Sequence, residues 1–167
     1  MSHHSAPPDF SDKRAGYEGL AAQLSALLAG ETDPIANAAN TAALIFEALP
    51  QVSWAGFYFL RGGELIVGPF QGKPACVRIA LGRGVCGTAA VRRETLIVPD
   101  VNAFPGHIAC DSAARSEVVV PLIAADRVAG VLDLDSTQPA RFDEIDARGL
   151  ERLAALFVQA SRMQELA

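Results

Sequence analysis

The chain has few cysteines, no run of basic residues and no long apolar segment. No apolar stretch approaches the roughly 20 residues that a membrane-spanning helix needs, and the N-terminus lacks the apolar core of a signal peptide. Acidic residues outnumber basic ones by 19 to 14, and the net charge is −5. This balance disfavours a nucleic-acid backbone or an anionic membrane as partner. We therefore expect a cytoplasmic protein.

The three cysteines, Cys76, Cys86 and Cys110, contain no Cys-x-x-Cys pair, which excludes a thioredoxin-type dithiol. An odd number of cysteines in a reducing compartment argues against a structural disulfide framework but leaves room for a transient redox disulfide. A zinc site built from these cysteines and His107 is disfavoured as well. Structural zinc ligands usually come in close pairs, and only His107 and Cys110 approach that spacing. We therefore expect no metal.

Sequence patterns divide the 167 residues into a tail and one domain. Residues 1–12 are rich in Pro, Ser and His and are expected to be disordered, and residues 13–167 are enough for one packed core. Helical spacing predicts helices over residues 13–29, 34–49, 84–93 and from Asp143 to about Glu165. Aromatic and β-branched runs predict strands over residues 52–60, 64–70, 75–79, 95–98, 117–123 and 127–136. This order indicates an α+β fold, with a central antiparallel sheet flanked on one face by N- and C-terminal helices.

Cys110 is the strongest candidate for a reactive thiol. A free cysteine is most often a small buried hydrophobe, but Cys110 lies in a long irregular connection, residues 99–115, among polar and turn-forming residues. Only the thiolate is nucleophilic, and a nearby positive charge lowers the thiol pKa. His107 and Arg115 are candidate sources of that charge. Either of the other two cysteines is a candidate to resolve an oxidised Cys110.

Three carboxylates occur on the two strands of the predicted hairpin. Asp133 and Asp135 share one face of their strand because side chains alternate, and Glu117 lies on the partner strand. Two acids at this spacing are also typical of a solvated strand face. A loop of odd length around residues 124–126 sets Glu117 opposite Asp133 or Asp135, whereas a two-residue loop sets it opposite Leu134 and separates the acids. If the acids meet, their repulsion raises at least one pKa and leaves a proton donor.

Trp54, Gly56 and Tyr58 share one face of the strand predicted over residues 52–60. Aromatic side chains in such a run are most often part of the core. A lone tryptophan next to glycine also suits the apolar wall of a small pocket.

Together these residues resemble the free methionine-(R)-sulfoxide reductases, a family built on the GAF-domain fold. The similarity runs from about residue 52 to residue 157. Its strongest stretches are WAGFY (54–58), GPFQGKPAC (68–76), GVCGTA (84–89), VPDV (98–101), FPGHIACDS (104–112), SE (116–117) and GVLDLDS (130–136).

The resemblance implies one GAF-like catalytic domain that reduces free L-methionine-(R)-sulfoxide without a cofactor, with thioredoxin as reductant, and it suits a homodimer. It implies Cys110 as nucleophile, Cys76 as first choice for the resolving thiol, and Cys86 as an alternative resolving thiol or relay. Glu117 and Asp135 are implied as the acids that polarise or protonate the sulfoxide. The substrate pocket is implied to be lined by Trp54, Tyr58, Glu117, Asp133 and Asp135. The competing interpretation is a GAF-type sensor that binds a small ligand and whose cysteines register oxidants.

Overall fold

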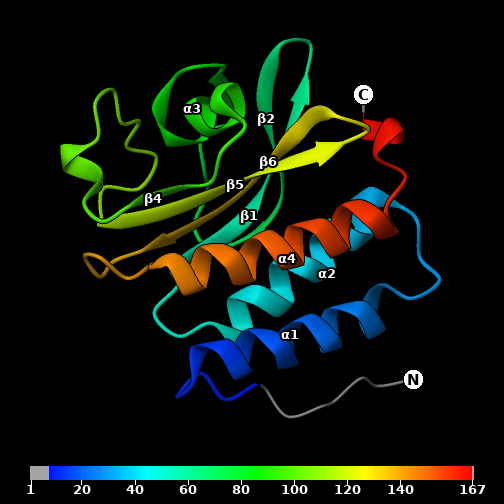
Figure 1. Cartoon of the computed structure of the whole chain (residues 1–167). Coiled ribbons are helices and arrows are strands. Elements are labelled where there is room, and N and C mark those ends of the chain that lie inside the picture. Colours follow the sequence, from blue (N-terminus) through cyan, green and yellow to red (C-terminus); the bar gives the residue numbers. More distant parts are fainter. Residues whose placement is uncertain (1–7, 167) are drawn as a thin grey trace.

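The computed structural model describes residues 8–166, which form a six-stranded antiparallel sheet covered on both faces (Figure 1). The strand order is β3-β2-β1-β6-β5-β4. In chain order the elements are α1 (Lys13–Leu28), α2 (Pro34–Ala48), β1 (Trp54–Arg61), β2 (Glu64–Gln71), β3 (Arg78–Ala80), α3 (Gly84–Arg92), β4 (Leu96–Val98), η1 (Val101–Ala103), β5 (Ser116–Ala124), β6 (Arg127–Ser136), α4 (Glu144–Ala160) and η2 (Met163–Leu166). The predicted α+β fold is confirmed. Within residues 8–166 none of the helices has the length and apolar character to cross a membrane.

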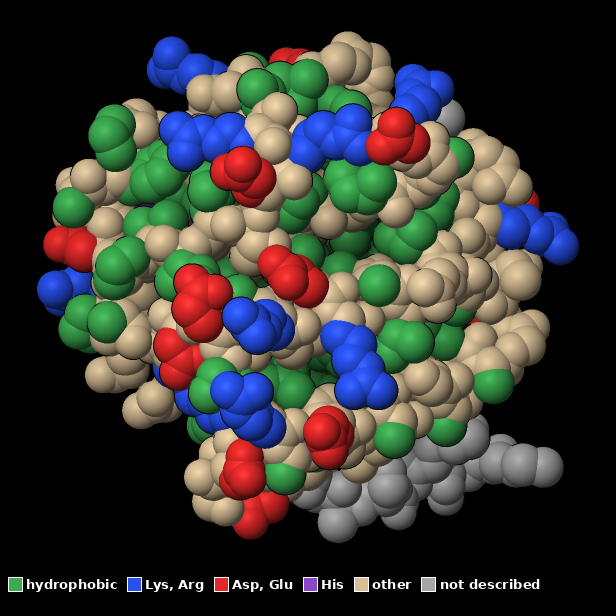
Figure 2. Space-filling model, in the orientation of Figure 1, with side chains coloured by type: hydrophobic (Ala, Val, Ile, Leu, Met, Phe, Trp, Pro, Cys, Tyr) green, Lys and Arg blue, Asp and Glu red, His purple; other side chains and the backbone are tan. Residues whose placement is uncertain are grey.

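Helices α1, α2 and α4 cover one face of the sheet (Figure 1) and enclose the larger hydrophobic cluster with it. Leu20 and Leu24 of α1 are fully buried, and Phe157 of α4 packs on Phe57 of β1 with ring centroids 4.6 Å apart. The apolar side of α1 is thus buried within the chain itself. Basic and acidic side chains are interspersed over the surface seen in Figure 2.

The prediction that the helices share one face is wrong for α3. This helix and the connection after β4 lie over the opposite face of the sheet (Figure 1). Val85 and Ala89 of α3 are buried there in a second cluster with Val119 and Val131 of the sheet. Both β5 and β6 carry apolar side chains on each face of the sheet. Each face therefore needs a covering layer.

The end of α4 and the residues just before α1 differ from the sequence prediction. Helix α4 ends at Ala160, five residues before the predicted end, because the next residues bond elsewhere: Arg162 donates its backbone N–H to the Thr32 carbonyl at 2.9 Å. Of the tail predicted to be disordered, residues 1–7 lie outside the described residues. Residues 8–12 are described, and there Phe10 meets Tyr17 edge-on at 5.2 Å and Asp12 caps α1. The other predicted boundaries agree with the structure within three residues.

The β5–β6 hairpin has a two-residue loop and still brings the acids together. Ala125 and Asp126 both have positive φ, as the tight turn that fits twisted strands requires. An additional residue on β6, Ala129, then shifts the pairing by one, so that Glu117 lies opposite Asp135. The expectation that a two-residue loop separates the acids is therefore wrong, because a β-bulge restores the register.

Candidate active site

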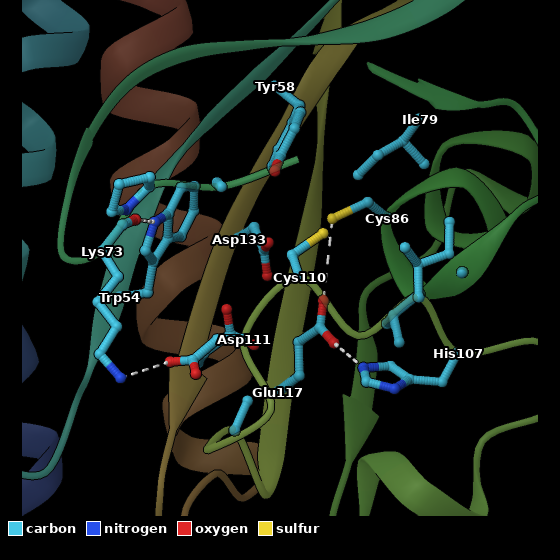
Figure 3. A pocket seen from close by; sticks show the side chains of 17 residues that line it. Trp54, Tyr58, Lys73, Ile79, Cys86, His107, Cys110, Asp111, Glu117 and Asp133 are labelled. Atoms are coloured by element: carbon cyan, nitrogen blue, oxygen red, sulfur yellow. Dashed lines mark hydrogen bonds and ion pairs between the residues drawn. The ribbon is translucent and has the colours of Figure 1, made fainter. Parts of the chain in front are cut away.

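A cavity of about 50 Å³ lies between the sheet and the layer formed by α3 and the connection after η1 (Figure 3). All of the predicted site residues except Cys76 line it: Trp54, Tyr58, Cys86, Cys110, Glu117, Asp133 and Asp135. They come from β1, α3, the connection, β5 and β6, so the fold unites residues that are distant in sequence. The structure brings these residues to one cavity, and their roles stay predictions.

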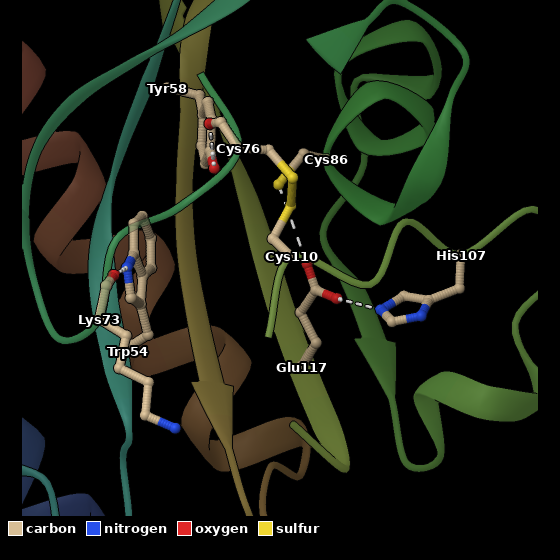
Figure 4. Close-up of a disulfide and its surroundings, with 8 residues drawn as sticks. All are labelled: Trp54, Tyr58, Lys73, Cys76, Cys86, His107, Cys110 and Glu117. Atoms are coloured by element: carbon tan, nitrogen blue, oxygen red, sulfur yellow. Dashed lines mark hydrogen bonds and ion pairs between the residues drawn. A yellow bond between two sulfur atoms is a disulfide. The ribbon is translucent and has the colours of Figure 1, made fainter. Parts of the chain in front are cut away.

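Cys76 and Cys110 form a disulfide beside this cavity, with Cα atoms 5.5 Å apart (Figure 4). Cys76 belongs to the connection between β2 and β3, and Cys110 to the connection between η1 and β5. Cys110 is exposed at the surface and Cys76 is partly buried. A bond between two connections without regular secondary structure, one end of it accessible, has the features of a redox disulfide that an external thiol can reach.

Cys86 is a free and buried thiol on α3, 3% exposed. Its Sγ lies 3.9 Å from Oε1 of Glu117. Burial raises the pKa of the Cys86 thiol well above its ordinary value, and the charges of Asp133 and Glu117 raise it further. Cys86 therefore stays protonated at neutral pH and is a poor nucleophile.

Burial and the charge of Asp133 make two of the three carboxyl groups of β5 and β6, those of Glu117 and Asp135, hold their protons more tightly than usual. Glu117 and Asp133 are 6% and 5% exposed. Burial raises the pKa of Glu117 well above its ordinary value, and the charges of Asp133 and Asp135 add to the effect. Burial likewise raises the pKa of Asp135, with the Asp133 and Asp111 charges as further causes. Glu117 and Asp135 thus keep their protons to higher pH than ordinary carboxyl groups do, which suits a proton donor.

Asp133 is the member of this cluster that ionises most easily. Burial raises its pKa to about 6, and hydrogen bonds from Glu117 and Cys86 act in the opposite direction. At neutral pH it is therefore mostly a carboxylate. Its Oδ1 atom is buried and has no hydrogen-bond partner among the described residues. A buried carboxylate oxygen without a partner indicates a place for a ligand.

Trp54 and Tyr58 line the cavity as its aromatic wall and also belong to the hydrophobic cluster on that face of the sheet. The two interpretations of the strand over residues 52–60, core and pocket wall, therefore both apply. The two aromatic rings stack with centroids 5.9 Å apart. The Trp54 Nε1–H donates to the Lys73 carbonyl oxygen at 3.0 Å, and the Tyr58 hydroxyl donates to the Cys76 carbonyl oxygen at 3.1 Å. Both aromatic residues thereby contact the segment that carries Cys76.

Sequence reasoning did not place Lys73 and Asp111 at the site, where their side chains form an ion pair of 3.6 Å across the cavity rim. The only hint was that each lies within one to three residues of a cysteine. His107 was expected to lower a thiol pKa, but burial lowers the pKa of His107 itself. A neutral imidazole supplies no positive charge. His107 instead lies 3.9 Å from Glu117.

Cys86, Glu117 and Asp133 are the residues here that could hold a cation. Their ligand atoms lie within 4.8 Å of one another, and one thiol with two carboxylates is a donor set that zinc accepts. The four-residue set considered from the sequence is not assembled, because Cys76 and Cys110 are bonded to each other.

Comparisons with known proteins agree with this geometry. The sequence matches the GAF domain family over residues 35–160. The free methionine-R-sulfoxide reductase of Escherichia coli K12 is 51% identical over 144 residues, which cover 86% of this chain and 87% of that protein. The enzyme of the same name from Saccharomyces cerevisiae is 44% identical over 165 residues, which cover 92% of each chain.

A solved structure leads to the same family. The free methionine-R-sulfoxide reductase from Neisseria meningitidis, in complex with its substrate, superposes with a TM-score of 0.90 at 47% identity and covers 94% of this chain and 95% of that one. With identities near 50% over most of the length of each relative, the chain belongs to the GAF-domain family and, within it, to the free methionine-R-sulfoxide reductases.

Proposed function

We propose that this protein reduces free methionine-(R)-sulfoxide to methionine, with residues 13–167 as one catalytic domain. The disulfide between Cys76 and Cys110, beside a cavity that contains buried carboxylic acids, carries this assignment. The relatives from Escherichia coli and Saccharomyces cerevisiae bear the name of this activity, and the Neisseria meningitidis relative was solved with its substrate.

The first half of the reaction transfers oxygen to Cys110. A sulfoxide sulfur is electrophilic, but its oxygen departs only when it is protonated. The Cys110 thiolate attacks the sulfur, and Glu117 or Asp135 protonates the oxygen; the raised pKa values of both acids support this role. Methionine departs, and Cys110 holds the oxygen as a sulfenic acid. Trp54 and Tyr58 pack against the methyl end of the substrate.

The second half restores the thiols. Cys76 condenses with the Cys110 sulfenic acid, which forms the disulfide and releases water. We assign this step to Cys76 because Cys86 is buried and its thiol pKa is raised. An external dithiol then reduces the disulfide by exchange at the exposed Cys110. Thioredoxin is the proposed donor.

The cavity also suits a free amino acid better than a methionine within a peptide. No group in residues 8–166 bonds the buried Oδ1 of the Asp133 carboxylate, and the α-ammonium group of a free amino acid supplies the missing positive charge. A peptide-bound methionine has no such group, so the buried carboxylate would stay unpaired at a cost of several kcal/mol.

The setting of the reaction follows from its chemistry. A cycle that needs a reduced dithiol and keeps Cys86 as a thiol is suited to the cytoplasm. A homodimer is proposed on the family relationship alone, since the apolar side of α1 is buried within the chain. Light scattering at several protein concentrations measures the oligomeric state.

The activity is tested by coupling the protein to thioredoxin, thioredoxin reductase and NADPH. We expect NADPH consumption with the free R epimer, and none with the S epimer or with peptide-bound methionine sulfoxide. Cys110→Ser should abolish it. Ala113→Ser, which adds a hydroxyl at an exposed position of the same connection, is the matched control. The assignment is overturned if the free R epimer is not reduced or if Cys110→Ser turns over normally.

The resolving thiol is identified by mass spectrometry after a single turnover. Cys86→Ser should still close the bond between Cys76 and Cys110, whereas Cys76→Ser should leave Cys110 as a sulfenic acid. A disulfide between Cys86 and Cys110 in the wild-type protein would reassign the resolving step to Cys86.

A further inference from the structure

We propose that Tyr58 and Trp54 are positioning residues for disulfide closure: their hydrogen bonds hold the backbone that presents Cys76 to Cys110. This inference rests on the proposed function and concerns its second half, after methionine has formed. It assigns the polar atoms of the two aromatic side chains a task separate from the contact of their rings with substrate.

Cys76 lies in a connection, residues 72–77, that has no regular secondary structure. From the cavity side, the Trp54 Nε1–H donates to the Lys73 carbonyl oxygen at 3.0 Å, and the Tyr58 hydroxyl donates to the Cys76 carbonyl oxygen at 3.1 Å (Figure 4). The two carbonyl groups lie at the two ends of the short stretch, residues 73–76, that carries the Cys76 side chain. The connection therefore takes its position from the two aromatic side chains.

The two donors belong to a rigid part of the molecule. Trp54 and Tyr58 lie on β1, which is paired with β2 on one side and β6 on the other. They are 6% and 2% exposed, and Trp54 also stacks on Phe70 with centroids 5.1 Å apart. Burial raises the pKa of the Tyr58 hydroxyl, and the nearby Asp133 charge raises it further, so the hydroxyl keeps its proton and stays a donor.

At the surface, a different contact joins the segment that carries Cys76 to the segment that carries Cys110. Lys73 and Asp111 form an ion pair of 3.6 Å, and the Lys73 side chain is 69% exposed. Exposed ion pairs of this kind contribute little, because water and salt screen them. The buried hydrogen bonds of Tyr58 and Trp54 are therefore the contacts expected to control where Cys76 lies.

Positioning matters because closure needs two sulfur atoms to meet. The Cys76 S–H bond and the Cys110 S–O bond break, the S–S bond forms, and oxygen leaves as water with two protons. The rate depends on the fraction of time for which the Cys76 sulfur is within reach. If Tyr58 no longer holds the carbonyl group of Cys76, the connection samples other conformations and that fraction falls.

The experiment is a rapid-quench single turnover of the full-length reduced protein with free methionine-(R)-sulfoxide. Methionine release and the Cys76–Cys110 disulfide are measured in the same samples, by chromatography and mass spectrometry, and dimedone traps the Cys110 sulfenic acid. For Tyr58→Phe we expect the ratio of the closure rate to the methionine-release rate to fall roughly fivefold to tenfold, as loss of one ordinary hydrogen bond predicts. The sulfenic acid should accumulate. Trp54→Phe, which removes the other donor, should change the ratio in the same direction.

Two control variants separate positioning from general loosening. Tyr17→Phe removes the hydroxyl of another buried tyrosine, which bonds Asp146 on the helix side of the sheet at 2.8 Å, and should leave the ratio within about twofold of wild type. Arg162→Met removes an exposed ion pair with Glu165, also of 3.6 Å and away from the cavity, and should do the same.

The possible results are distinct. An unchanged ratio in Tyr58→Phe, or an equal fall in Tyr17→Phe, overturns the inference while methionine release in the wild-type protein still supports the proposed function. If the wild-type protein releases no methionine, the proposed function fails and the inference fails with it.

Discussion

Replacing Asp133 with asparagine is expected to stabilise the folded protein at pH 8. Burial raises the pKa of Asp133 from 3.8 to about 6. The folded state therefore binds the proton more tightly than the unfolded state does. The resulting stability is fully present below about pH 4 and is lost as the pH rises through about 6.

The size of this effect follows from the two pKa values. The difference between 3.8 and about 6 corresponds to about 3 kcal/mol at roughly 1.4 kcal/mol per pKa unit. Asparagine keeps the shape of the side chain but carries no charge, so Asp133→Asn should gain up to about 3 kcal/mol at pH 8. In a chain of this length the gain corresponds to a rise in Tm of about 6–12 °C. At pH 4 most of the gain should disappear, because Asp133 is then neutral in the folded protein as asparagine is.

Urea unfolding of the disulfide form at pH 4 and pH 8 measures the effect, with fluorescence of the single tryptophan, Trp54, as signal. The matched control is Asp126→Asn in the hairpin turn. The Asp126 side chain is 94% exposed, so its replacement should change the free energy of unfolding by less than about 0.5 kcal/mol at either pH. A variant Asp133→Asn that is no more stable than wild type at pH 8, or whose gain is equal at both pH values, would refute the reasoning.

Three further results are expected. Asp146→Ala should lower the free energy of unfolding, measured in urea, by about 3–5 kcal/mol. The fully buried Asp146 carboxylate accepts hydrogen bonds from Tyr17 and from the almost buried Arg141, and both donors would lose this acceptor. Deletion of Ala129 should remove the bulge but keep Glu117 opposite Asp135, because every residue after the bulge keeps its partner, so a single turnover should still release methionine, with circular dichroism as check on folding. The disulfide form should bind methionine at least about tenfold more weakly than the reduced form in calorimetry, since its cavity of about 50 Å³ holds only a few water molecules.

Local signals in the sequence were sufficient for most of the elements. Asp33 followed by Pro34 predicted the start of α2, where Asp33 accepts a hydrogen bond from the Ala36 N–H at 2.8 Å. Asp143 predicted the start of α4 and forms a capping box with Asp146. The end of α4 depended on hydrogen bonds to the loop before α2, and no local pattern carries that information.

The β5–β6 register shows most clearly what the sequence could not supply. The sequence left the loop length open; the observed two-residue loop by itself would set Glu117 opposite Leu134, and the extra residue Ala129 cancels that shift. The neighbouring Gly130 passes so close to β1 that an added Cβ would lie 3.0 Å from the Cα of Phe59. The bulge and this close approach depend on β1, which is not part of the β5–β6 hairpin. Rules that consider the hairpin alone therefore cannot predict the bulge.

Alternation along β6 explains how the fold tolerates buried acids. Leu132 and Leu134 point to the helix side and are fully buried, while Asp133 and Asp135 point to the cavity. Burial of each leucine contributes about 1.5–3 kcal/mol, which offsets the roughly 3 kcal/mol that the ionised Asp133 costs at neutral pH. Strand β6 carries both the two leucines and the two acids. Substitution of either leucine should therefore loosen the position of the acids as well as destabilise the core. The acids can be changed to neutral isosteres with no such loss, and the gain expected for Asp133→Asn follows from this asymmetry.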